Sequence, residues 1–143
     1  MNIKLLKEAI AIIECVPDYR IDIGSWQSNE GADLIKCLDQ IECGTIACAA
    51  GYLALHPKMQ ALGLSPGYHG APSFKGLFQF EALSEFFDLS PLKTRYLFGD
   101  RSPQEKNDDQ MLGTGFTDRV LWLTRARKII ADHESRFAEI ILV

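Results

Sequence analysis

Apolar residues near the start of the chain recur three or four positions apart, at Ile3, Leu6, Ile10 and Ile13. Charged residues fill the positions between them, and Pro17 ends the pattern. This spacing predicts a first helix over residues 2–15 with one apolar face. A similar pattern after Ser28 predicts a second helix that ends near Ile41.

The third expected helix, residues 45–56, has small residues where the others have large ones. Ala47, Ala50, Gly51 and Ala54 form one stripe along it. Because glycine inside a helix costs up to about 1 kcal/mol relative to alanine, a close approach of another backbone is the simplest explanation. We therefore expect this helix, placed between Cys43 and Pro57, to form the centre of a helical bundle.

Residues 63–80 interrupt the helical pattern with four glycines and two prolines. A long loop is expected here, and long loops are often functional. It carries several rings, and aromatic side chains contribute much of the energy at protein interfaces. The candidate binding residues are Tyr68, His69, Phe74 and Phe78. The rings either form a binding surface or lie flat as a lid on the core.

The segment FEALSEFFDLSPLKTRYLF predicts two short helices joined by a turn, with Ser90 and Pro91 starting the second. It has the outline of a helix-turn-helix, in which Lys93 and Arg95 are candidate binding residues. Asp88 stands where such a turn usually has glycine. Since 15 basic and 19 acidic residues give a net charge of −4, a plain helical hairpin is the preferred interpretation and nucleic acid is not the expected partner.

The remaining segments complete the expected architecture. Residues 99–115 are polar and rich in turn formers, Thr117 caps a last helix, and the tail EIILV is apolar. This tail must pack on the body of the protein or on a partner, and one alternative is a homodimer formed through the tail. The expected fold is all-α: one domain of residues 1–143, with five or six helices around residues 45–56 and a long aromatic loop at 63–80.

Length and composition place the chain among soluble, single-domain proteins. No apolar run approaches the roughly 20 residues that a membrane-spanning helix needs, and the start does not resemble a signal peptide. We therefore expect a cytoplasmic protein without membrane contact, whose cysteines at 15, 37, 43 and 48 are reduced. No pair has C-x-x-C spacing, so neither a metal site nor a cofactor is expected.

Cys43 is a candidate nucleophile because amide groups and the dipole at the start of a helix lower the pKa of a thiol. The segment DQIECGTIAC resembles the nucleophile segments of papain-like and ubiquitin-like-protein-cleaving thiol proteases. His69 is the candidate base and Gln40 the candidate oxyanion donor. His56 lies about 18 Å along the same expected helix, too far to serve. The alternative is that Cys43 simply packs at a helix start.

The order CGTIACAAGYLALHP, GLSPGYHGAPSF, FEALSEFFDLSPLKTRYLFG and RARKII resembles a group of small proteins of bacteria and their phages. That group shares a CGT-x-x-C-x-x-G segment and a later FFxLS-to-LFG segment, and the likeness covers about residues 26–130. The resemblance implies a small accessory protein, including inhibitors of host or defence machinery. We expect a protein that acts by binding another protein. The alternatives are a thiol hydrolase and a helix-turn-helix nucleic-acid binder.

Overall fold

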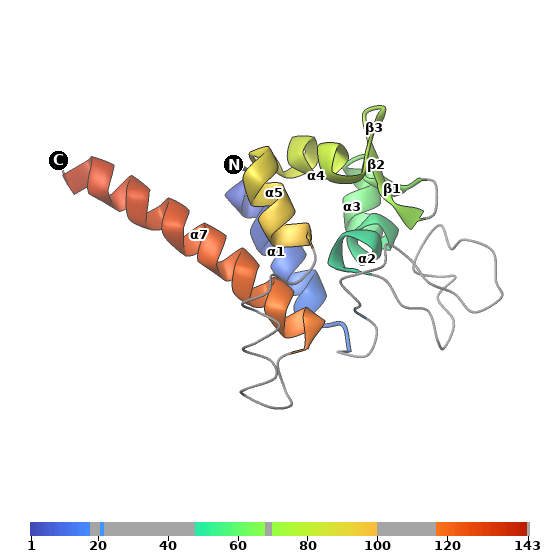
Figure 1. The fold of residues 1–143 in the computed structure, drawn as a ribbon, viewed down its shortest axis with the longest axis horizontal. Coiled ribbons are helices and arrows are strands. Elements are labelled where there is room, and N and C mark those ends of the chain that lie inside the picture. The colour runs from blue at the N-terminus through green and yellow to red at the C-terminus, as the bar shows by residue number, and fades with distance from the viewer. Residues whose placement is uncertain (18–20, 22–47, 68–69, 100–116, 143) are drawn as a thin grey trace.

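The computed structural model describes residues 1–17, 21, 48–67, 70–99 and 117–142, with side chains up to residue 136 in the last segment (Figure 1). These residues are mostly helical. The helices are α1 (Ile3–Glu14), α2 (Ala49–Leu55), α3 (Pro57–Ala61), α4 (Gln79–Phe87), α5 (Pro91–Phe98) and α7 (Asp118–Leu142). The second expected helix, residues 43–47 and residues 100–116 lie outside the described part of the chain.

The segment expected to be a long loop instead contains a small antiparallel sheet, so the all-α class was wrong in this respect. Its strands are β1 (Ser65–Pro66), β2 (Pro72–Phe74) and β3 (Leu77–Phe78), paired in that order. Lys75 and Gly76 both have positive φ, of 50° and 79°, between β2 and β3. Two such residues form the tight turn that matches the twist of a hairpin, which is why this glycine-rich stretch folds back on itself.

The expected central helix is buried where the structure describes it. The side chain of Cys48 caps α2 by accepting from the Gly51 amide at 3.3 Å, and every residue of α2 except Tyr52 is buried. The helix ends at Leu55, because His56 has extended backbone dihedral angles. Pro57 then begins α3, a short helix that the sequence pattern did not predict.

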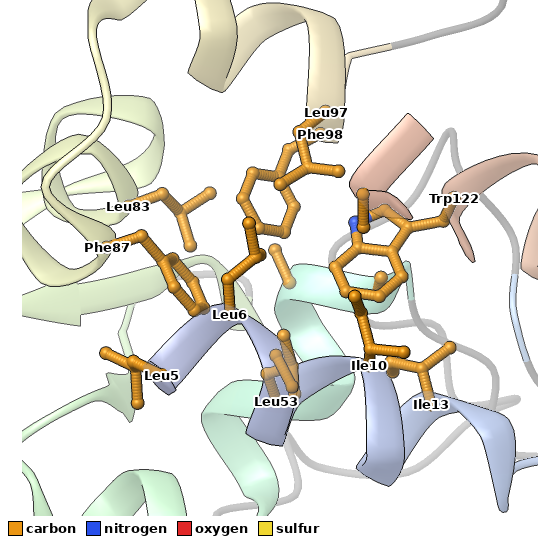
Figure 2. Packing of buried hydrophobic residues seen from close by; sticks show 14 of the residues in the cluster. Leu5, Leu6, Ile10, Ile13, Leu53, Leu83, Phe87, Leu97, Phe98 and Trp122 are labelled. Carbon is orange, nitrogen blue, oxygen red and sulfur yellow. The ribbon is translucent and has the colours of Figure 1, made fainter. Parts of the chain in front are cut away.

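The described helices share one hydrophobic core, shown in Figure 2. Leu6 and Ile13 of α1 are fully buried, and Phe87 of α4 and Trp122 of α7 pack into the same core. A series of aromatic contacts crosses it from the sheet to α7. The ring centroids of neighbouring members lie 5.0 Å apart for Phe74 and Phe86 and 5.0 Å apart for Phe86 and Phe87. The distance is 5.8 Å from Phe87 to Phe98 and 5.9 Å from Phe98 to Trp122.

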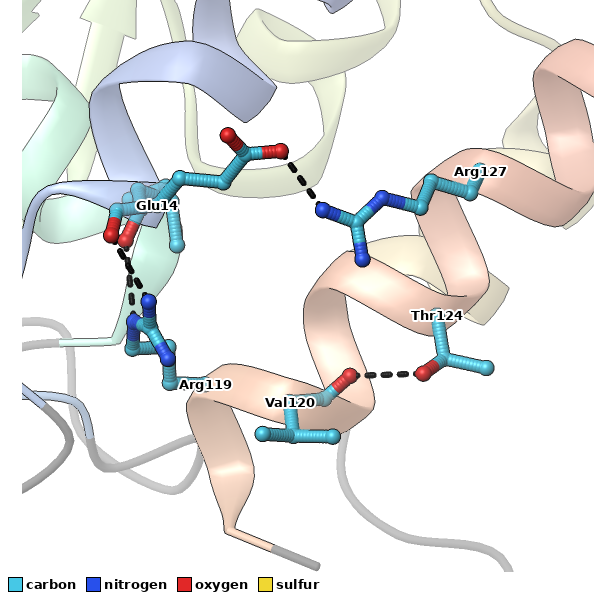
Figure 3. A network of polar contacts seen from close by, with 6 residues as sticks. Glu14, Arg119, Val120, Thr124 and Arg127 are labelled. Carbon is cyan, nitrogen blue, oxygen red and sulfur yellow. Dashed lines mark hydrogen bonds and ion pairs between the residues drawn. The ribbon is translucent and has the colours of Figure 1, made fainter.

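Helix α7 runs antiparallel to α1 and is tied to it by polar contacts (Figure 3). Arg119 donates from Nε to the Ile13 carbonyl at 3.1 Å and from Nη2 to the Glu14 carbonyl at 2.7 Å. These carbonyls belong to the last turn of α1, where helix carbonyls lack partners of their own. Arg127 pairs with the Glu14 carboxylate in the same place. The guanidinium groups thus neutralise the negative end of the α1 dipole.

The C-terminal half of α7 extends past the other helices in Figure 1. Residues 131–136 are exposed, and the helical backbone continues to Leu142. The side chains of the apolar tail lie outside the described part of the chain, so its packing on a partner stays a prediction. Among the described residues, no helix combines the length and the apolar character that crossing a lipid bilayer requires.

Helices α4 and α5 form the expected hairpin, with Leu83, Phe87, Leu89 and Leu97 buried. Asp88 takes the left-handed conformation at the end of α4, with φ 53° and ψ 51°. The turn therefore needs the backbone conformation that glycine usually supplies, and aspartate adopts it here. The Met1 ammonium group donates to the exposed Asp88 carboxylate at 2.8 Å and lowers its pKa.

The hairpin is closed by a buried hydroxyl pair, and removing it gives a first prediction. Thr94 is fully buried, its hydroxyl donates to the Ser90 carbonyl at 2.9 Å, and it lies 2.7 Å from the Ser84 hydroxyl. Thr94→Val keeps the shape and leaves the Ser84 hydroxyl without this partner, whereas the Ser90 carbonyl still accepts from the Thr94 amide at 2.9 Å. The free energy of unfolding should therefore fall by about 1 kcal/mol in urea denaturation.

Thr124→Val is the matched control, because the exposed Thr124 hydroxyl donates to the Val120 carbonyl at 2.8 Å within its own helix. This change should alter stability by less than about 0.5 kcal/mol. Equal losses in the two variants would contradict a special contribution of the buried pair.

Candidate functional site

A groove of about 280 Å³ lies between α5 and α7. Its walls are Leu92, Lys93 and Tyr96 of α5 and Lys128, Ile129, Asp132, His133 and Arg136 of α7. Leu92 is 82% exposed and Tyr96 is 42% exposed. Most of a leucine side chain thus remains in water beside a concave surface, an arrangement that burial by a ligand would make favourable.

The sequence of α5 explains why these apolar side chains face outward. Ser90 caps the helix and Pro91 is its first residue, so the register of the helix is set at its start. Thr94, Leu97 and Phe98 then face the core and are buried. Leu92 and Tyr96, four residues apart, share another face of the same helix. Both side chains therefore lie on the exposed side of α5, where the groove is formed.

A buried arginine of α7 contacts the end of α5 and the Tyr96 ring beside the groove. Arg125 is only 3% exposed, and its Nη1 donates to the Gly99 carbonyl at 2.8 Å. Its guanidinium carbon also lies 5.6 Å from the centre of the Tyr96 ring. Because Arg125 belongs to α7 and Gly99 ends α5, this contact holds the two helices together. A groove that is already formed loses less entropy when it binds a ligand.

The charge around the groove differs in sign from that of the whole chain. Among the described lining residues, Lys93, Lys128 and Arg136 carry positive charges and Asp132 carries a negative one, whereas the chain has a net charge of −4. Lys128, Asp132 and Arg136 are four residues apart and follow one row of α7. The apolar surface is therefore bordered by a locally basic rim, which favours an acidic partner.

The binding residues expected from the sequence fall in three different surroundings. Lys93 lines the groove, whereas Arg95 lies over the Phe80 ring, 5.1 Å from its centre. Phe74 is partly buried and meets the Phe86 ring edge-on, as a lid on the core would. Phe78 is 58% exposed, as a binding surface would require. Tyr68 and His69 lie outside the described residues, as do the Cys43 and Gln40 of the expected catalytic set.

Sequence reasoning missed most of the groove. Of the described lining residues, only Lys93 is among the binding residues expected from the sequence. The spacing of four residues in both helices was the available signal. It shows which side chains share a face, but not that the two faces meet.

A second cavity, of about 420 Å³, lies between α1 and the corner where α2 meets α3. It is lined by Glu8, Ala11, Ile12, Cys15, Val16, Tyr52, His56 and Lys58. The imidazole of His56 caps α3, since its Nδ1 accepts from the Lys58 amide at 3.2 Å. Burial, and to a smaller extent the charge of Lys58, lowers the pKa of His56. The neutral ring therefore carries its proton on Nε2.

The position of this proton bears on thiol chemistry. Cys15 is exposed and shares the cavity with His56. A general base must accept the thiol proton, but Nε2 of His56 already carries a proton while Nδ1 caps α3. The two side chains thus do not form a nucleophile and base in this arrangement. Cys48 is buried and caps α2.

The capping role of His56 gives a prediction for the pH dependence of stability. Because the folded-state pKa is below the ordinary value of about 6.5, the unfolded chain binds more protons as the pH falls. The stability contributed by neutral His56 is complete above the unfolded-state pKa of about 6.5. It is lost as the pH falls below this value and then through the lower pKa of the folded state. Urea denaturation from pH 8 to pH 5 should show this loss.

His56→Asn should keep the stability at pH 8, because asparagine caps helices well, and should reduce the loss on acidification. His133→Asn, on the exposed part of α7, is the matched control and should retain the wild-type slope. An unchanged slope in His56→Asn would contradict the assignment.

Within the described residues, no group of three or more histidine, cysteine, aspartate or glutamate side chains could hold a metal ion. Comparison of the chain with protein-family models, curated proteins and solved structures finds no match.

Proposed function

We propose that this chain is a small cytosolic accessory protein that binds another protein, and that the α5–α7 groove receives an amphipathic helix with acidic residues beside its apolar face. The 82% exposure of Leu92, next to a preformed concave surface, is the observation that carries the proposal. An apolar side chain in water is a source of binding energy that the isolated protein does not use.

The shape and charge of the groove support a helical, acidic partner. Two helices border it, and a third helix can place residues at i, i+3, i+4 and i+7 along such a surface. Leu92, Tyr96 and Ile129 supply the apolar contacts, while Lys128 and Arg136 meet negative charges on the partner. The partner's apolar residues would provide most of the affinity and its carboxylates would fix the orientation.

The sequence resemblance to small bacterial and phage proteins supplies the context of the proposal. In that setting the bound helix belongs to a component of host or defence machinery, which the protein inhibits by occupying a surface that the component needs. Phe78, 58% exposed on β3, is a further contact for a large partner.

The test uses two synthetic helical peptides with the same leucines at i, i+3, i+4 and i+7. One has glutamate beside the apolar face and the other has lysine. In fluorescence anisotropy at low salt, the acidic peptide should bind at least about tenfold more tightly, because like charges across an interface are unfavourable. Added salt should reduce this difference.

Equal binding of the two peptides would contradict the basic rim as a determinant, and failure of both to bind would contradict the helix-binding groove. Duplex DNA is the third probe. Tight, salt-sensitive DNA binding that the acidic peptide does not compete with would favour the nucleic-acid alternative instead.

A further inference from the structure

The cavity between α1 and the α2–α3 corner combines opposite charges with an apolar surface. Glu8, Ala11, Ile12 and Cys15 are spaced as i, i+3, i+4 and i+7, so one face of α1 forms one side. His56 and Lys58, at the start of α3, contribute polar groups from another element. Among the described residues, the linings of this cavity and of the α5–α7 groove share no member.

The polar groups differ in what they can bind. Lys58 carries a cationic ammonium group, and the neutral His56 ring has an Nε2–H donor because its Nδ1 is engaged with the Lys58 amide. Two donors, one of them charged, match a carboxylate. Glu8, on α1, has a carboxylate that matches an ammonium group.

Part of the remaining described lining is apolar. Ala11, Ile12 and Val16 contribute only hydrocarbon surface, and the Tyr52 ring lies beside them. Hydrocarbon and polar groups thus line the cavity together, and a volume of about 420 Å³ lies in the usual range of small-molecule sites. The lowered pKa of His56 is a further property that such sites often share.

We infer that this cavity binds a small zwitterion with an apolar body, of the class of free hydrophobic amino acids. The ligand carboxylate meets Lys58 and His56, the ammonium group meets Glu8, and the side chain lies against Ile12 and Val16. The site adds a small-molecule ligand to a protein proposed to act by protein binding, and neither depends on the other.

Cys15 provides a readout, because its exposed thiol lines the cavity. The rate of its alkylation by iodoacetamide is followed by mass spectrometry of the Cys15 peptide in the full chain. Millimolar L-leucine or L-phenylalanine should slow this rate. N-acetyl-L-leucine lacks the ammonium group and L-leucinamide lacks the carboxylate, so each should need an at least about tenfold higher concentration for equal protection.

Two variants locate the ligand. Lys58→Met and Glu8→Gln should each weaken protection by the free amino acids about tenfold or more. Lys4→Met is the matched control, since Lys4 is an exposed residue of α1 that does not line the cavity. The free amino acids should protect Cys15 in this variant as well as they do in the wild type. Urea denaturation of each variant without ligand verifies that it is folded, and protection is compared with the rate of the same variant without ligand.

Absence of protection by both amino acids would overturn the inference. The inference would also be overturned if the acetylated and amidated derivatives protected as well as the free amino acids, or if protection survived undiminished in both Lys58→Met and Glu8→Gln. Peptide binding in the α5–α7 groove is measured separately, so failure here leaves the proposed function standing.

Discussion

Leu92→Asp is expected to weaken binding of the acidic amphipathic peptide about a hundredfold or more. The change removes a leucine side chain worth about 1.5–3 kcal/mol on burial and places a carboxylate against an acidic, apolar ligand. Together these effects exceed about 3 kcal/mol, or two factors of ten in the dissociation constant. Fluorescence anisotropy with the labelled acidic peptide measures the loss directly.

The same variant should fold normally, so the loss can be assigned to binding. Leu92 is 82% exposed and is the second residue of α5, a position where aspartate interacts favourably with the helix dipole. Its free energy of unfolding should stay within about 0.5 kcal/mol of the wild type.

Leu62→Asp is the matched control for this experiment. Leu62 is 53% exposed at the end of α3 and does not line the groove, so the control should bind the peptide as the wild type does. Unchanged binding by Leu92→Asp, or equal losses in the two variants, would contradict the groove as the binding site.

Trp122→Ala is expected to have the largest effect on stability, a loss of about 3–5 kcal/mol in the free energy of unfolding. Trp122 is 1% exposed, and its ring lies next to that of Phe98 at the end of the aromatic series that crosses the core. Alanine would leave a large cavity where α7 meets the other helices. Because small domains have only about 5–15 kcal/mol in total, urea denaturation should show a much lower midpoint.

Trp122→Phe separates the ring from its N–H group. The indole Nε1 is buried without a hydrogen-bond partner among the described residues. Phenylalanine keeps most of the apolar volume and removes this unpaired donor, whose burial costs about 1–3 kcal/mol. The loss should therefore stay below about 1.5 kcal/mol. A loss as large as that of Trp122→Ala would indicate that the N–H group has a stabilising role.

Local patterns predicted several elements closely. The expected first helix, residues 2–15, corresponds to α1, and Ser90 and Pro91 start α5 as their residue types indicate. The inward position of Ala50, Gly51 and Ala54 was also correct. Caps and apolar spacing act within one or two turns of the chain, so they can be read without knowledge of distant residues.

The sheet and α3 were missed for reasons that are also physical. Strands of two or three residues are too short for an alternating pattern, and the β2–β3 turn was recognisable only from a single glycine, Gly76. Proline both ends a preceding helix and begins a new one, and the sequence around Pro57 does not show that it does both here.

By itself, the sequence determined the mainly helical character of the described chain, the buried positions of Leu6, Ile10 and Ile13 in α1, and those of Ala50, Gly51 and Ala54 in α2. Only the tertiary structure decided that the Leu92 face of α5 meets the Lys128 row of α7, and that His56 and Lys58 lie across a cavity from Glu8. Helical periodicity depends on neighbours three or four residues away, whereas a groove or cavity depends on contacts between segments far apart in the chain. Those contacts are set by how the core packs, so no local pattern records them.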